Sequence, residues 1–176
     1  MKNFLQGASS FRISIILAIM LLLVTLNSIY YFFSIAKVKA IEWLVFNACA
    51  PSNIVFLIGF IIFLFTKNRM VINMAILPMF FFGGLGLFLF PWTGFNIVAQ
   101  ISHIVMTLNV WWAVWETFRL GDFRVAFIGL LLGVLCFSPF IGFQQSYANA
   151  HSKDLVRILG VDEDNFKEKY GIKKNN

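Results

Sequence analysis

The sequence is short of charge. Only 12% of its 176 residues are Asp, Glu, Lys or Arg, against roughly 25% in an ordinary soluble domain, and 60% are hydrophobic. That shortage excludes a typical water-soluble domain and indicates that lipid is the main solvent of the folded chain. The formal net charge of +6 does not indicate nucleic-acid binding, because the Lys and Arg residues fall between long apolar runs and in the C-terminal tail.

Cysteine pairs and ligand-binding motifs are scarce as well. Cys49 and Cys136 both lie in apolar runs and do not make a disulfide framework. The sequence contains no CxxC motif, no His-rich segment and no phosphate-binding glycine loop. We therefore expect neither a metal site nor a cofactor.

Five apolar runs are long enough to cross a bilayer. A helix rises about 1.5 Å per residue, so about 20 residues span a hydrocarbon core of about 30 Å. Backbone groups in lipid must be paired within the segment, which requires helices. The sequence thus predicts an all-α, polytopic membrane helix bundle over residues 1–147, followed by a charged, partly helical tail at 148–176. The predicted spans are 13–36, 41–66, 70–92, 95–118 and 123–147.

The distribution of Lys and Arg predicts the orientation of this bundle. Six such residues lie near the membrane on the side of the N-terminus and four on the other side. Because Lys and Arg are enriched in cytoplasmic loops, we expect a multi-pass membrane protein with a cytoplasmic N-terminus.

The stretch "FNACAPSN", residues 46–53, gathers polar groups inside the second predicted span. Pro51 has no N–H to donate to the carbonyl of Asn47, so we expect a kink near Cys49 and an unpaired carbonyl beside the thiol. Asn53 follows Cys49 by four residues and shares its helix face. A reactive thiol or a polar packing seam are both consistent with this pattern.

The fourth predicted span carries a polar stripe. Its members step by four, three and four residues along one helix face, and they are Asn96, Gln100, His103 and Thr107. Polar side chains are costly against lipid, so this face is expected to point inward. His103 lies eight residues into its span, as Cys49 does, and Asn27 lies nine residues before the first span ends. We therefore expect Cys49, His103 and Asn27 at one depth.

A thiol and an imidazole at one depth suggest acyl transfer. A neutral imidazole can take the thiol proton, after which the thiolate attacks an ester carbonyl and forms a thioester. Asn27 or Gln100 would orient the ring, and the Asn47 amide would stabilise the oxyanion. Cys49 and His103 are thus the candidate catalytic residues. The candidate substrate-binding residues are Asn27, Asn47, Asn53, Asn96, Gln100 and Thr107.

The segments "LVFNAC" at 44–49, "FFGGLGLFLFP" at 81–91 and "ISHIVM" at 101–106 resemble a known group. They are similar to the YwaF-like bacterial integral membrane proteins and to their animal transmembrane relatives, proposed to move acyl chains among phospholipids. The resemblance covers residues 42–106. It implies Cys49 as nucleophile, His103 as base and a bacterial cell membrane as the location.

Two non-enzymatic interpretations stay open. In one, the chain is a small transporter or channel whose polar stripe lines a path or a ligand pocket. In the other, it is an accessory subunit whose stripe docks a helix of a partner membrane subunit or of a second copy. Membrane lipids are the partners expected in every case, and nucleic acid is not.

Overall fold

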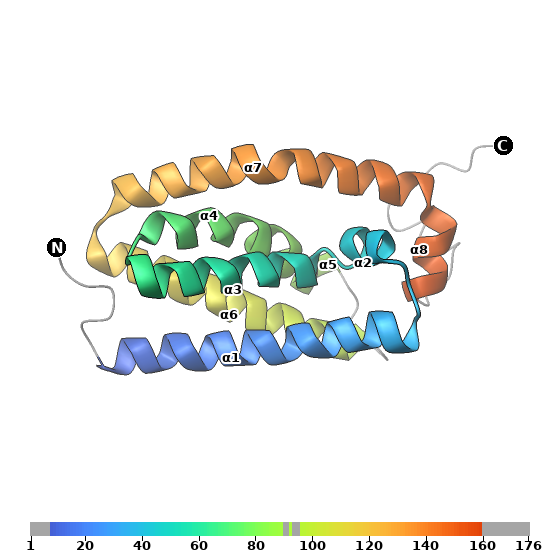
Figure 1. Ribbon diagram of the computed structural model, residues 1–176, viewed down its shortest axis with the longest axis horizontal. Coiled ribbons are helices and arrows are strands. Elements are labelled where there is room, and N and C mark those ends of the chain that lie inside the picture. The colour runs from blue at the N-terminus through green and yellow to red at the C-terminus, as the bar shows by residue number, and fades with distance from the viewer. Residues whose placement is uncertain (1–7, 90–91, 93–95, 160–176) are drawn as a thin grey trace.

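Five membrane-length helices run alongside one another. The computed structural model describes residues 8–89, 92 and 96–159, and in this part of the chain five helices are long and apolar enough to cross a membrane. The predicted all-α, polytopic class is thereby confirmed. Figure 1 shows α1 and α7 on the outside, with α3, α4 and α6 between them. The elements are α1 Ala8–Tyr30, η1 Tyr31–Ile35, α2 Ala40–Phe46, α3 Cys49–Thr66, α4 Arg69–Met79, η2 Phe80–Gly84, α5 Gly86–Leu89, α6 Asn96–Leu120, α7 Phe123–Ala150 and α8 Ser152–Leu159.

The second predicted span, 41–66, is not one helix. The chain forms the short helix α2, breaks at Asn47, where φ is −125° and ψ is 49°, and starts α3 at Cys49. Pro51 therefore lies in the first turn of α3, where a missing N–H is tolerated. The sequence predicted that the Asn47 carbonyl would be unpaired. That prediction is wrong, because the carbonyl accepts a hydrogen bond from the Ala50 amide at 3.0 Å.

The third predicted span, 70–92, is also interrupted. Pro78 lies inside α4, and two residues later the chain widens into the π-helix η2, in which the Leu85 amide donates to the Phe80 carbonyl at 3.2 Å. A π-turn inserts one extra residue into a helix, and such turns often accompany functional sites.

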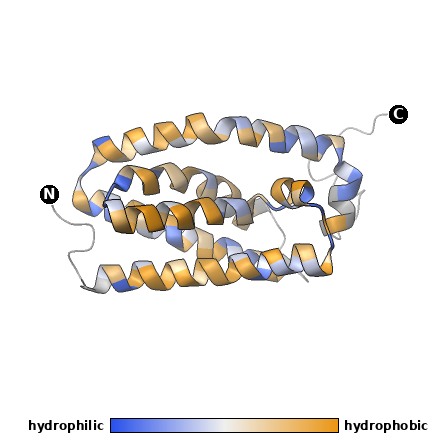
Figure 2. Ribbon diagram, viewed as in Figure 1, coloured by the Kyte–Doolittle hydropathy of each residue, from blue (hydrophilic) through white to orange (hydrophobic). Residues whose placement is uncertain are grey.

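The core lies where α3, α4 and α6 meet, and α1 closes one side of it. Its fully buried side chains include Leu21, Phe63, Met79 and Met106. The outward faces carry large apolar side chains, and Phe65 and Phe88 are 83% and 86% exposed. Figure 2 shows hydrophobic residues along much of the two outer helices, α1 and α7. Apolar surface of this extent fits a lipid environment.

Two glycines bring α7 close to α4. A Cβ at Gly129 would lie 2.7 Å from the carbonyl oxygen of Met70, and one at Gly133 would lie 2.7 Å from that of Met74. Pro78 cannot donate to the Met74 carbonyl within α4, so that oxygen lies where the α7 backbone approaches. Small residues at such positions let membrane helices pack by backbone contact.

Charged and polar side chains hold the opposite end of the bundle from α2. Arg119 binds the buried carboxylate of Glu116 one turn away, with Nη2 and Oε2 2.6 Å apart, and Arg69 lies 3.6 Å from Asp122. The hydroxyl of Thr117 donates to the side-chain oxygen of Asn73 at 3.3 Å, which joins α6 to α4.

The described part of the predicted tail is mostly helical. Helix α7 continues to Ala150, and the short helix α8 follows it directly. The rest of the predicted tail, 160–176, lies outside the described residues.

Replacing Gly133 by Ala tests the close contact of α4 with α7. The added Cβ would meet the backbone of α4 (2.7 Å from Met74 O), which cannot move aside, so we expect a loss of about 2 kcal/mol in the free energy of unfolding. Thermal unfolding of the detergent-solubilised protein measures it. Gly142→Ala is the matched control, because a Cβ there meets no atom within 4 Å. Equal unfolding midpoints for the two variants would contradict the proposed packing.

Candidate functional site

The thiol of Cys49 and the imidazole of His103 meet inside the bundle. Cys49 is the first residue of α3, and His103 lies about two turns into α6. Cys49 Sγ and His103 Nε2 are 3.2 Å apart, within the range of a hydrogen bond to sulfur. The structure thus brings the two predicted catalytic side chains together, and it does so at a helix start that the sequence did not predict.

Gln100 holds the far side of the His103 ring. Its Oε1 is 3.1 Å from Nδ1 of His103, and its Nε2 donates to the Gly86 carbonyl at 3.5 Å. In the tautomer with its proton on Nδ1, His103 donates to Gln100 and presents Nε2 as an acceptor to the thiol. Both side chains are buried, so this orientation is kept away from lipid and water. The arrangement is that of a nucleophile, a base and an orienting group.

The sulfur atom has a second acceptor within reach. Cys49 Sγ donates to the carbonyl of Phe82 at 3.4 Å, and Phe82 lies in the π-helix η2. A thiol has one proton, so it can be shared with Phe82 or passed to His103. Cys49 is the first residue of α3, so its sulfur lies at the N-terminal end of that helix.

Glycines make room for two side chains of α6, one of which is the imidazole of His103. A Cβ at Gly86 would lie 2.7 Å from Cε1 of His103 and 2.8 Å from Nδ1. At Gly83 it would lie 2.6 Å from the Met106 side chain. The groups that approach these glycines are therefore side chains of α6, and the ring of His103 lies against the backbone of α5.

Asn27 is not part of this site. It is exposed on α1, and its neighbour Ser28 accepts a hydrogen bond from Nδ2 of Asn47 at 2.7 Å. Residues one apart on a helix point about 100° away from each other, so a prediction made from depth alone selected the wrong neighbour. The Asn47 amide, expected to stabilise an oxyanion, is bonded to Ser28 and joins the helix break to α1.

The remaining predicted residues divide by location. Asn53 is buried one turn beyond Cys49 and donates to the Thr25 hydroxyl at 3.0 Å, which joins α3 to α1. The hydroxyl of Thr107 donates to the His103 carbonyl at 2.8 Å within its own helix. The side chain of Asn96 lies outside the described residues.

Sequence reasoning missed three groups that shape the site. One is the Phe82 carbonyl, and no side-chain pattern marks the role of a backbone carbonyl. The other two are Ser28 and Gln144, whose Nε2 donates to the Val45 carbonyl at 3.2 Å. Ser28 follows Thr25 by three residues on the inner face of α1, and that spacing is a signal the sequence does contain.

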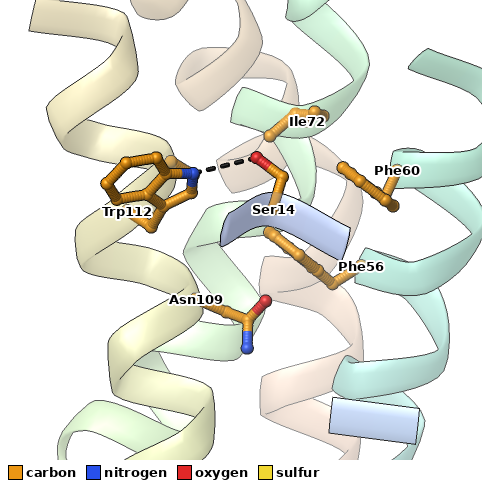
Figure 3. A pocket seen from close by; sticks show the side chains of 7 residues that line it. Ser14, Phe56, Phe60, Ile72, Asn109 and Trp112 are labelled. Atoms are coloured by element: carbon orange, nitrogen blue, oxygen red, sulfur yellow. Dashed lines mark hydrogen bonds between the residues drawn. The ribbon is translucent and has the colours of Figure 1, made fainter. Parts of the chain in front are cut away.

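A separate cavity lies nearer the other end of the bundle. It has a volume of about 20 Å³, room for about one water molecule, and Figure 3 shows its lining with the Trp112 indole N–H donating to the Ser14 hydroxyl at 2.9 Å. Its lining residues are Ser14, Phe56, Phe60, Ile72, Asn109, Trp112 and Ala113. In the described part of the chain, none of these side chains takes part in the hydrogen bonds given above for Cys49 and His103.

Comparison with known proteins assigns no family to this geometry. No protein-family model, no curated protein and no solved structure matches the chain. The resemblance over residues 42–106 therefore stays a prediction, and the roles of Cys49 and His103 are argued from their geometry.

Replacing Gly86 by Ala tests the placement of the His103 ring. The new Cβ would overlap the imidazole, 2.7 Å from Cε1, and displace it from the thiol. In a Cys136→Ala background, which leaves one thiol, we expect the rate constant for alkylation of Cys49 by N-ethylmaleimide to fall about tenfold or more. Gly142→Ala should match the parent. An unchanged rate in Gly86→Ala would show that Gly86 does not set the ring position.

Proposed function

We propose that this protein is an integral membrane lipid-handling enzyme that transfers or hydrolyses acyl esters with Cys49 as nucleophile and His103 as base. The observation that carries the proposal is the 3.2 Å contact between Sγ and Nε2, with Gln100 at the other ring nitrogen. An imidazole oriented in this way between an acceptor and a thiol is the arrangement that cysteine nucleophiles require.

The proposed reaction has two balanced steps. Nε2 of His103 takes the proton of the Cys49 thiol, and the sulfur attacks the carbonyl carbon of an ester. The alcohol part leaves with the proton returned by the imidazolium, and the acyl group stays on sulfur as a thioester. Water or a second alcohol then attacks the thioester and gives its proton to His103. The acyl group leaves on that oxygen, and the thiolate recovers the proton.

Membrane lipids are the proposed source of the ester. The span that contains His103 begins at Ile97, so the ring lies about 9 Å along the helix from that end. This depth is comparable to that of the ester bonds below a headgroup layer. A lipid ester could thus reach the sulfur from one leaflet without crossing the bilayer centre.

The proposed location is a cell membrane, bacterial by the resemblance, with the N-terminus in the cytoplasm. Among the described residues, the end opposite α2 carries five Lys and Arg residues near the membrane, and these are Arg12, Lys67, Arg69, Arg119 and Arg124. The end with α2 carries Lys37, Lys39 and Lys153, besides Arg157 on α8. Basic residues favour the cytoplasmic side, so Cys49 and His103 would lie toward the leaflet that faces away from the cytoplasm.

Host lipids test the proposed activity. Cells expressing the parent protein should show an altered acyl-chain distribution in their phospholipids, measured by mass spectrometry. Cys49→Ala and His103→Ala, at equal expression, should restore the distribution of cells without the protein. Cys136→Ala is the matched control, because Cys136 is exposed on the outer face of α7, away from His103.

A different result would favour the non-enzymatic alternatives. Acyl profiles that are identical for the parent and Cys49→Ala would contradict the enzyme. If a lipid-like thiol-reactive probe then labelled Cys49 equally with and without His103, and the protein supported solute flux in liposomes, a transporter or channel would be the better description.

Single cysteines test the orientation. In a Cys49→Ala, Cys136→Ala background, a membrane-impermeant maleimide added to intact cells should label Lys39→Cys, because this residue lies at the end with α2. Arg124→Cys, at the other end, should be labelled only after the membrane is permeabilised. The reverse pattern would invert the proposed topology. Both side chains are exposed, so accessibility within the protein does not limit either reaction.

A further inference from the structure

Gln144 makes a hydrogen bond that links α7 to the helix break before Cys49. Its Nε2 donates to the carbonyl of Val45 at 3.2 Å, and Val45 is fully buried in α2. Figure 1 shows α2 between the end of α1 and the far end of α7. The next residue, Gln145, is exposed and points away. Of the two adjacent glutamines, Gln144 is therefore the one that faces the bundle, where it is half-buried.

The carbonyl of Val45, which accepts this hydrogen bond, lies just before the break between α2 and α3. Val45 precedes Cys49 by four residues, so its carbonyl is the group that the Cys49 amide would pair with in an uninterrupted helix. In this structure the carbonyl is held by a side chain of α7, and the chain turns at Asn47 before α3 begins. The Gln144 side chain therefore occupies the carbonyl in the last turn of α2 that would accept the Cys49 amide if α2 and α3 were one helix.

Neighbouring contacts support the same junction from both sides. Tyr147, one turn after Gln144, places its ring 6.0 Å from the ring of Phe46. On the other side, Asn47 donates to Ser28 of α1 at 2.7 Å. The break is thus held between α1 and α7, and Cys49 follows it after one residue.

The membrane makes this hydrogen bond difficult to replace. In water, a carbonyl that loses its partner is solvated, whereas in an apolar environment it stays unpaired, which is unfavourable. Removing the Gln144 amide should therefore favour a shift of α2 toward continuous helical pairing. Such a shift would move Cys49 away from His103, since the position of Sγ depends on the first turn of α3.

We infer that Gln144 is a positioning residue for the proposed reaction: through Val45 it holds the α2–α3 break that sets the Cys49 thiol beside His103. Gln144 touches neither reacting atom. The inference rests on the proposed function for its chemical meaning, but the placement of the thiol can be measured without any substrate.

Alkylation of Cys49 by N-ethylmaleimide tests this role in the full-length protein with Cys136→Ala. Gln144→Met keeps the side-chain length and removes the donor, Gln144→Leu is the second variant, and Gln145→Met is the matched control. We expect the alkylation rate constant to fall about tenfold in the Gln144 variants and to stay at the parent value in Gln145→Met.

A double-mutant cycle separates positioning from general destabilisation. If Gln144 acts by placing the thiol beside His103, adding His103→Ala to Gln144→Met should slow alkylation no further. Additive effects, or a parent-like rate in both Gln144 variants, would overturn the inference. If His103→Ala alone leaves the rate unchanged, the proposed function fails; if His103→Ala slows alkylation and the Gln144 variants do not, only the role of Gln144 fails.

Discussion

The contact between Sγ of Cys49 and Nε2 of His103 depends on a helix that stops. If residues 41–66 formed one helix, Cys49 would be an interior residue with its sulfur fixed by the regular backbone. The break at Asn47 instead makes Cys49 the first residue of α3 and places it at the positive end of a helix. The rest of the site is arranged around that position: Gln100 orients the ring, and Gly86 leaves space for it.

The lipid environment explains why so many polar groups near the helix break have hydrogen-bond partners. Water cannot satisfy a broken helix in the hydrocarbon region, so each interruption needs partners from neighbouring helices. Asn47 and Val45 are bonded to α1 and α7, and the π-helix η2 presents its Phe82 carbonyl to the thiol. The polar groups near Cys49 therefore serve two purposes. They stabilise the irregular backbone, and they leave the sulfur within hydrogen-bond distance of the Phe82 carbonyl and of His103, the group that can take its proton.

Hydrophobic and polar periodicity predicted the helices and much of the site. It failed at positions where contacts between distant segments determine the backbone or the side-chain direction. The apolar runs identified the membrane segments, and the steps of three and four placed Gln100 and His103 on one inward face. Depth alone chose Asn27, although the inward side chain is Ser28, because one residue of error rotates a side chain by about 100°. The break at Asn47 was expected only as a kink. From the local sequence, a proline in the first turn of a helix cannot be told from a proline in a helix interior. The position of the break is fixed by contacts with Gln144 and Ser28, which are distant in the sequence.

We propose that this geometry makes the thiol of Cys49 a nucleophile toward lipid esters. The most direct measurement is the intact mass of the purified Cys136→Ala protein after incubation with vesicles of one phospholipid of defined chain length. The account predicts a mass increase of one acyl chain on Cys49, removed by neutral hydroxylamine and absent in His103→Ala. Folded protein that acquires no acyl chain on Cys49, or acquires it equally without His103, would contradict the account.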